Sequence, residues 1–155
     1  MQALCKGERD EIFFPADEIP EWFSYRGDGS SLSFHLPEFS FGDELVAMIV
    51  WVVFGVDEIG FLTLQYPSAV IKNKSNSIKL VERSIDVGNI STSHSWVSYA
   101  PFVVRPCAME GGGELELKVE VEEDAMVMIC GVHLVVKRGR DHSQGLPLKK
   151  LYSRL

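Results

Sequence analysis

The residues that could do acid–base or metal chemistry lie scattered along this chain. Its histidines match no spacing that holds a metal ion; they are His35, His94, His133 and His142. A histidine that stands alone on the outer side of a strand is most often a hydrogen-bonded surface residue. The sequence therefore predicts no metal site, and nothing in it requires a cofactor.

The cysteines indicate the compartment rather than a reaction. Cys5, Cys107 and Cys130 are odd in number and form no Cys-x-x-Cys pair, and no signal peptide is apparent at the N-terminus. Both features are typical of a reducing, intracellular setting, the cytoplasm or the nucleus. Cys130 lies within an apolar segment, where we expect an unreactive buried thiol.

Acidic residues are plentiful but form no convincing catalytic pair. Asp57 and Glu58 lie in an expected turn, as do residues 122–124. Solvated loop acids are far commoner there than a pair of catalytic carboxylates. Gly111 to Gly113 fall between strands and open no helix, so they do not resemble a phosphate-binding loop. We therefore expect a protein that is not an enzyme.

The tripeptide Arg26-Gly-Asp28 is of a type that extracellular adhesion receptors recognise. A tripeptide is weak evidence, and the chain has the features of an intracellular protein. We interpret it as a plain turn, in which Gly27 and Gly29 permit unusual backbone angles.

Charge is unevenly distributed. The net charge is −7, yet six of the 15 basic residues follow Val136, so the rest of the chain is strongly acidic. An acidic surface repels phosphate groups, which argues against nucleic-acid binding by the folded part. The longest apolar run, residues 45–54, is about half of a membrane span, so no transmembrane helix is expected.

The apolar periodicity is that of β-strands. Residues 31–36 and 114–122 alternate in polarity, while residues 45–54 are apolar on both faces and predict a central strand, with a buried helix as the alternative. Further strands are expected at 12–14, 61–66, 69–72, 78–81, 96–104 and 126–136. Eight to ten antiparallel strands predict an all-β sandwich of the jelly-roll or immunoglobulin type over residues 10–137, followed by a mobile basic tail, 138–155.

Two strands allow their faces to be assigned. In residues 114–122, the apolar side chains would point inward, and the charged row would protect an exposed sheet edge from pairing with another copy. In residues 126–136, alternation places one set on the core side and Gly131 and His133 on the other; the core set is Met126, Met128, Cys130, Val132, Leu134 and Val136.

The segment Glu18-Ile-Pro-Glu-Trp-Phe23 predicts a corner. Pro20 fixes the backbone, and Trp22 and Phe23 each offer a large apolar surface for burial. Both would anchor the corner, and Trp22→Ala would then cost roughly 3–5 kcal/mol.

This corner, with Gly29-Ser-Ser31 and Leu36-Pro37 after it, resembles the start of the C-terminal jelly-roll and immunoglobulin-like (C-JID) domain, which follows the leucine-rich repeats in plant immune receptors of the TIR type. Three further stretches fit the order of that family: 12–15, 96–101 and 130–135. The matching scaffold residues are Pro20, Trp22, Phe23, Gly29, Pro37, Trp96, Tyr99, Pro101 and Gly131. The region from Asp57 to Ser93 has no clear counterpart.

The resemblance implies a recognition domain without catalytic activity. It would bind a pathogen effector protein beside the neighbouring leucine-rich repeats of the same receptor and contribute to receptor activation. The NAD-cleaving activity of such receptors resides in a TIR domain, which this chain does not contain. Since loop tips carry recognition on a sandwich, the predicted contact residues are Arg26, Asp28, Asp57, Glu58, Asn89, Ser91, Ser93 and His94.

A carbohydrate-binding jelly roll is the alternative function. Trp96 and Tyr99 could stack on a sugar ring, although the same spacing also suits core and rim packing.

Overall fold

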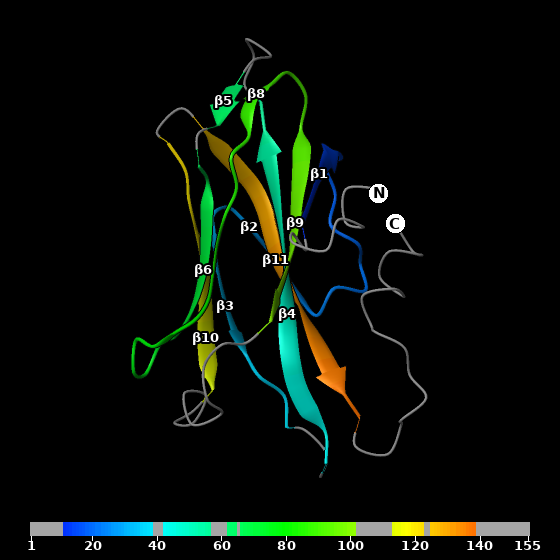
Figure 1. The fold of residues 1–155 in the computed structure, drawn as a ribbon, viewed down its shortest axis with the longest axis vertical. Coiled ribbons are helices and arrows are strands. Elements are labelled where there is room, and N and C mark those ends of the chain that lie inside the picture. Colours follow the sequence, from blue (N-terminus) through cyan, green and yellow to red (C-terminus); the bar gives the residue numbers. More distant parts are fainter. Residues whose placement is uncertain are drawn as a thin grey trace.

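The computed structural model describes residues 11–38, 42–56, 62–64, 66–101, 113–122 and 125–138. Within these ranges the chain is all β, as predicted, and forms two packed antiparallel sheets and a small two-stranded sheet of β5 and β8 (Figure 1). The strands are β1 (Glu11–Pro15), β2 (Tyr25–Asp28), β3 (Ser31–His35), β4 (Glu44–Gly55), β5 (Leu62–Leu64), β6 (Ser68–Asn73), β7 (Lys79–Ser84), β8 (Gly88–Ile90), β9 (His94–Pro101), β10 (Glu114–Glu120) and β11 (Met126–Lys137). No helix in the described part is long and apolar enough to cross a membrane.

The first sheet is built around β4. Its five strands have the order β1-β9-β4-β11-β2, so β4 lies in the middle, between β9 and β11. All of its residues from Ala47 to Gly55 are buried, which confirms the prediction of a central strand covered on both faces and rules out the buried helix. Covering both faces of one strand requires an apolar layer on each side.

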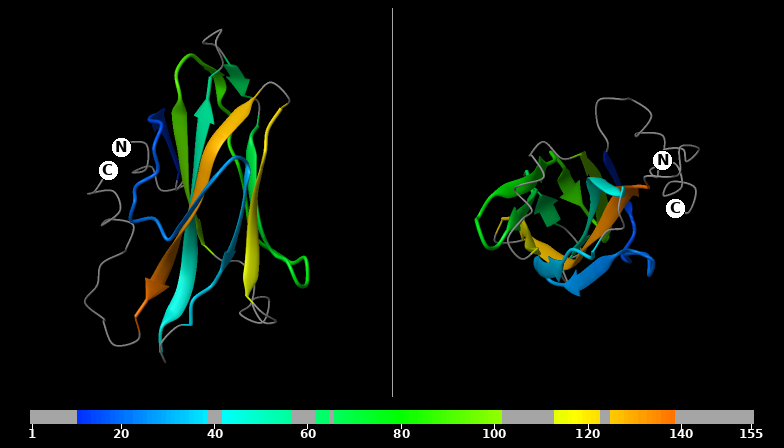
Figure 2. Two further views of the ribbon diagram at one scale, coloured as in Figure 1. Left: turned by 180° about the vertical axis from the view of Figure 1, so that it is seen from behind. Right: turned by 90° about the horizontal axis from the view of Figure 1, so that it is seen from below.

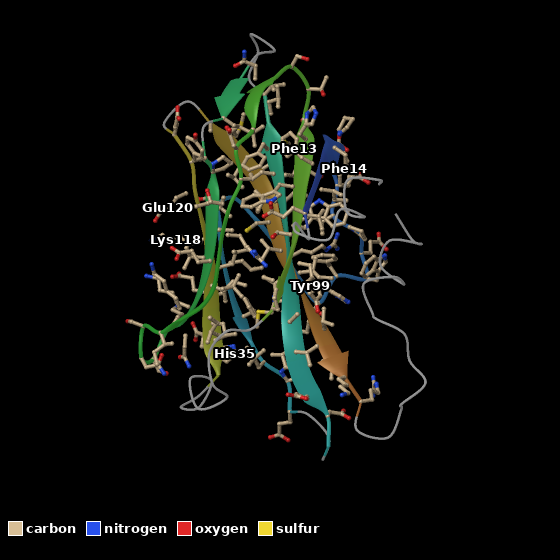
Figure 3. All side chains as sticks on the ribbon, in the orientation of Figure 1. Phe13, Phe14, His35, Tyr99, Lys118 and Glu120 are labelled. Atoms are coloured by element: carbon tan, nitrogen blue, oxygen red, sulfur yellow. The ribbon has the colours of Figure 1, made fainter. Side chains whose placement is uncertain are left out.

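The second sheet has the order β3-β10-β6-β7, with β10 in its interior. Leu115, Leu117 and Val119 point into the sandwich as predicted and are buried there. The expectation that this strand forms an exposed edge is wrong, because β3 and β6 pair with its two sides. Its charged row instead covers the outer face of the sheet, where Lys118 and Glu120 point away from the sandwich (Figure 3).

The face assigned to the first part of β11 is also wrong. Cys130 and Val132 lie in the core between the sheets, but Met126 and Met128 are 44% and 45% exposed. The cause is a register shift between Val127 and Ile129, where β11 has one more residue than its partner β4. A β-bulge of this kind interrupts the alternation of faces, so the pattern of residues 130–136 does not extend back to Met126.

A second apolar layer lies on the outer side of the five-stranded sheet. Residues 16–24, which we call the covering segment, connect β1 to β2 and lie on the side of this sheet that faces away from the four-stranded sheet (Figure 2, left). Ile19 and Phe23 from this segment pack with Ile49, Trp51 and Val53 of β4. The corner predicted from the sequence is therefore the cover that allows β4 to be apolar on both faces.

Two strands were not predicted. Arg26-Gly-Asp28 lies in β2, which pairs with β11 from Ile129 to Val132, so the interpretation as a turn is wrong. Likewise, residues 89–94 are not one loop, because Asn89 lies in β8 and His94 begins β9. Backbone pairing, with β11 in the case of β2 and with β5 in the case of β8, rather than local apolar character, forms these short strands.

Candidate protein-binding surface

Most of the described contact residues gather at one end of the sandwich, the end where β4 finishes; we call it the β4 end. Here His94 is the pairing partner of Phe54. Strand β8 and its connection to β9 lie at the same end (Figure 1). Asp28 pairs with Ile129, which in turn pairs with Val53. Three strand spacings separate β2 from β9, so Asp28 and the start of β9 are about 14 Å apart.

The remaining predicted contact residues of this end differ in their exposure. Asn89 and Ser91 are exposed, and Ser93 is half-buried. Asp57 and Glu58 lie outside the described residues. The exposed positions are therefore available to a partner, and their role in contact stays a prediction.

Arg26 holds the scaffold together. Its Nη1 donates a hydrogen bond to the carbonyl oxygen of Ile19 at 3.1 Å. This bond attaches the covering segment to edge strand β2, and it satisfies a backbone acceptor of that segment. Arg26 thus has a structural task that its sequence context did not reveal.

His94 also has a structural contact. Its ring stacks on Phe13 with centroids 4.9 Å apart, and its Nδ1–H donates to the carbonyl oxygen of Thr92 at 2.9 Å. The ring therefore fixes the start of β9 against β1. Only part of its surface remains for a partner.

Phe23 and Trp22 do not contribute equally to the corner. Phe23 is 5% exposed and packs edge-on against Trp51, with ring centroids 5.4 Å apart. Trp22 is only half-buried and rests on Phe23 and His133. Pro20 accepts a hydrogen bond from the Phe23 N–H at 3.1 Å, which closes the turn. Phe23 is therefore an anchor as predicted, whereas Trp22, which was expected to share this role, is anchored less deeply.

The covering segment is also attached to β11. The backbone N–H of Ser24 donates to Nδ1 of His133, and the Ser24 hydroxyl accepts a hydrogen bond from the Leu134 N–H, both at 3.2 Å. His133 is thus a hydrogen-bonded histidine, in agreement with its position on the outer phase of β11. It is half-buried rather than fully on the surface.

The positions of the other scaffold residues explain their structural roles. Gly29 has φ +84° and turns the chain from β2 into β3, a conformation that favours glycine. Gly131 lies under the covering segment, where a Cβ would come within 2.8 Å of the Tyr25 carbonyl oxygen. Pro37 follows β3 and is exposed, and Pro101 ends β9.

The geometry removes the basis for sugar binding by Trp96 and Tyr99. Trp96 is fully buried and stacks with Phe54 in the core, 6.5 Å between centroids. Tyr99 pairs with Ile49, which belongs to the outer layer. The two rings thus lie on opposite faces of the sheet and cannot form one platform.

Residues that could do chemistry are equally separated. In the ranges that the structure describes, no three His, Cys, Asp or Glu side chains come together in a way that could hold a metal ion. An exposed cluster lies at the end opposite the β4 end, where Lys74 Nζ contacts Glu114 Oε1 at 2.8 Å. The hydrogen bond from Lys74 lowers the pKa of Glu114 and raises the pKa of Lys74.

Cys130 is buried between the sheets, and desolvation raises the pKa of its thiol to about 11. An unfolded thiol ionises near 8.5, so from about pH 9 to 11 the unfolded state loses a proton that the folded state keeps. We expect the free energy of unfolding to fall by about 3 kcal/mol across this range because of Cys130. Urea unfolding at pH 8 and pH 11 measures this, with Cys130→Ala as the control that lacks this contribution. Equal pH slopes for the two proteins would contradict it.

The β4 end also exposes apolar residues that the sequence did not predict. Met126 and Met128 belong here because Met126 pairs with Gly55. Tyr66, just before β6, is 67% exposed and has φ 51°, in the left-handed region. No pattern in the sequence separates these side chains from core residues, since their exposure depends on the bulge in β11 and on a strained turn.

Comparison with protein families identifies the domain. The family model of the C-JID domain matches residues 14–141. No curated protein matches the chain.

Proposed function

Since this chain belongs to the C-JID family, the domain that follows the leucine-rich repeats in plant TIR-type immune receptors, we propose that it binds a pathogen effector protein and thereby contributes to receptor activation. The membership confirms the resemblance carried by the corner and strand motifs. It also makes this a receptor domain of a family that is not catalytic. Neighbouring leucine-rich repeats are the proposed second half of the binding surface, and the proposed location is the cytoplasm or nucleus.

The observation that carries the proposal is a difference between two parts of the molecule. One face of the five-stranded sheet is covered by chain, whereas the β4 end exposes polar side chains. The covering segment closes the outer face of the five-stranded sheet and is attached by Arg26 and Ser24. The β4 end, in contrast, presents Asp28, Asn89 and Ser91 to solvent. Strand ends and the loops that join them on a rigid sandwich are a common place for recognition residues, because the scaffold positions them at little entropic cost.

The acidic character of the chain supports a protein ligand over a nucleic acid. The net charge is −7, so a phosphate backbone would be repelled. A protein partner can instead offer complementary basic side chains, which also accelerate association.

Binding to candidate pathogen proteins tests this function. The domain joined to its receptor's leucine-rich repeats should bind a pathogen protein that triggers the receptor, and the repeats alone should bind it at least about tenfold more weakly. Calorimetry on the two proteins measures the difference. If the repeats alone bind as tightly as the joined protein, this domain does not contribute to recognition.

A further inference from the structure

An apolar patch lies on the outer face of the five-stranded sheet at the β4 end. It consists of Gly55, Met126 and Met128, and we call it the methionine patch. Gly55 is the pairing partner of Met126. A Cβ on Gly55 would come within 2.6 Å of the Met128 sulfur and 3.7 Å of the Met126 methyl carbon. Both thioether side chains therefore lie over the bare backbone of Gly55.

The patch continues the apolar outer layer beyond its cover. Val53 and Trp51 precede Gly55 along β4 and belong to the layer that Ile19 and Phe23 cover. The two methionines, in contrast, are 44% and 45% exposed. Among the other large apolar side chains in the described ranges, only Tyr66 and Ile78 are at least 40% exposed, so this exposure is unusual for the molecule.

The bulge in β11 creates this exposure. It places Met128 in the extra position between Val127, which pairs with Phe54, and Ile129, which pairs with Val53. Bulges often redirect a side chain next to a functional site. Methionine side chains are flexible and polarisable, and they adapt to apolar partners of different shape.

The surroundings of the patch are acidic. Asp28 is exposed on β2 and pairs with Ile129, directly beside Met128 in sequence. Glu122, which is exposed and lies four residues before Met126, adds a second carboxylate at this end. An occupant should therefore be apolar at its centre and positively charged around it.

We propose that the methionine patch binds a protein surface on which an apolar side chain is flanked by lysine or arginine. This deepens the proposed function and rests on it, because it names the chemistry of the partner. A second copy of this chain is disfavoured as occupant, since it would bring one acidic surface against another at a net charge of −7 each.

The test uses peptides selected from a random phage-displayed library on the immobilised domain. The selected peptides should combine an aromatic or aliphatic residue with lysine or arginine, and their affinity should fall as salt is raised. In spectra of the protein labelled with ¹³C at the methionine methyls, Met126 and Met128 should shift on peptide addition. Met48, which is fully buried, provides the internal control.

Variants separate the apolar from the electrostatic contribution. Met126→Ser with Met128→Ser should weaken peptide binding about tenfold, and Asp28→Lys should weaken it and reduce its salt dependence. The matched controls are Ile78→Ser, an apolar side chain 40% exposed in the β6–β7 turn, and Glu44→Lys at the far end of β4. Both should leave binding unchanged, and thermal melting verifies that each variant is folded.

Three outcomes would overturn the proposal: no enrichment of basic and apolar peptides, methionine signals that do not shift, or binding that Ile78→Ser reduces as much as the methionine substitutions. Competition by a peptide covering residues 141–155 would make the chain's own basic tail the occupant, also against the proposal. None of these results depends on a pathogen protein, so failure here is distinguishable from failure of effector binding.

Discussion

Phe23→Ala is expected to lower the free energy of unfolding by about 3–5 kcal/mol. The ring is 5% exposed and contacts Trp51 edge-on beneath the covering segment. Its removal leaves a cavity under the cover and separates that segment from β4. Denaturant unfolding of the variant and the parent measures the loss, which approaches the whole stability of an ordinary domain.

The neighbouring tryptophan provides the comparison. Trp22 is half-buried, so Trp22→Ala should cost only about 1–2 kcal/mol. Tyr66→Ala, at an aromatic residue that is 67% exposed, should change stability by less than about 0.5 kcal/mol. If Trp22→Ala destabilised more than Phe23→Ala, the main anchor of the corner would be Trp22, and our assignment of Phe23 would fail.

Gly131→Val is expected to destabilise by about 3 kcal/mol or more, because a side chain here meets main chain. A Cβ on Gly131 would lie 2.8 Å from the Tyr25 carbonyl oxygen and 3.3 Å from Ile19 and Phe23. The backbone of β2 or the whole covering segment must then move. Thermal melting and the fluorescence of Trp22 and Trp51 report both effects.

Gly27→Ala provides a matched control on the adjacent strand. A Cβ there would also be crowded, at 2.9 Å, but only by the end of the Leu32 side chain. That side chain can rotate, so the cost should be about 1 kcal/mol. Equal costs at Gly27 and Gly131 would show that the covering segment yields easily, contrary to our description.

The sequence predicted those parts of the fold in which one strand has one uniform environment. β10 alternates without interruption because it has one core face and one solvent face. β4 is apolar throughout because the covering segment adds a second apolar layer. In both cases the apolar pattern along the strand matches its environment directly, so the pattern predicts both the strand and the burial of its side chains.

The binding surface could be predicted only in part. β2 was missed because Tyr25-Arg-Gly-Asp is short and polar, and pairing with β11 stabilises it. The exposure of Met126 and Met128 was missed because a bulge has no signature in the apolar pattern. The gathering of Asp28 and His94 at one end depends on strand order, which local sequence does not encode.

The most direct test of recognition by the β4 end compares two loop exchanges in the complete receptor. One replaces Ser91-Thr-Ser93, which connects β8 to β9 at this end; the control replaces residues 74–78, the β6–β7 turn at the opposite end. The measurement is the dissociation constant for the pathogen protein that triggers the receptor. We predict a loss of at least about tenfold for the first exchange and no change for the second; the reverse pattern would contradict the account.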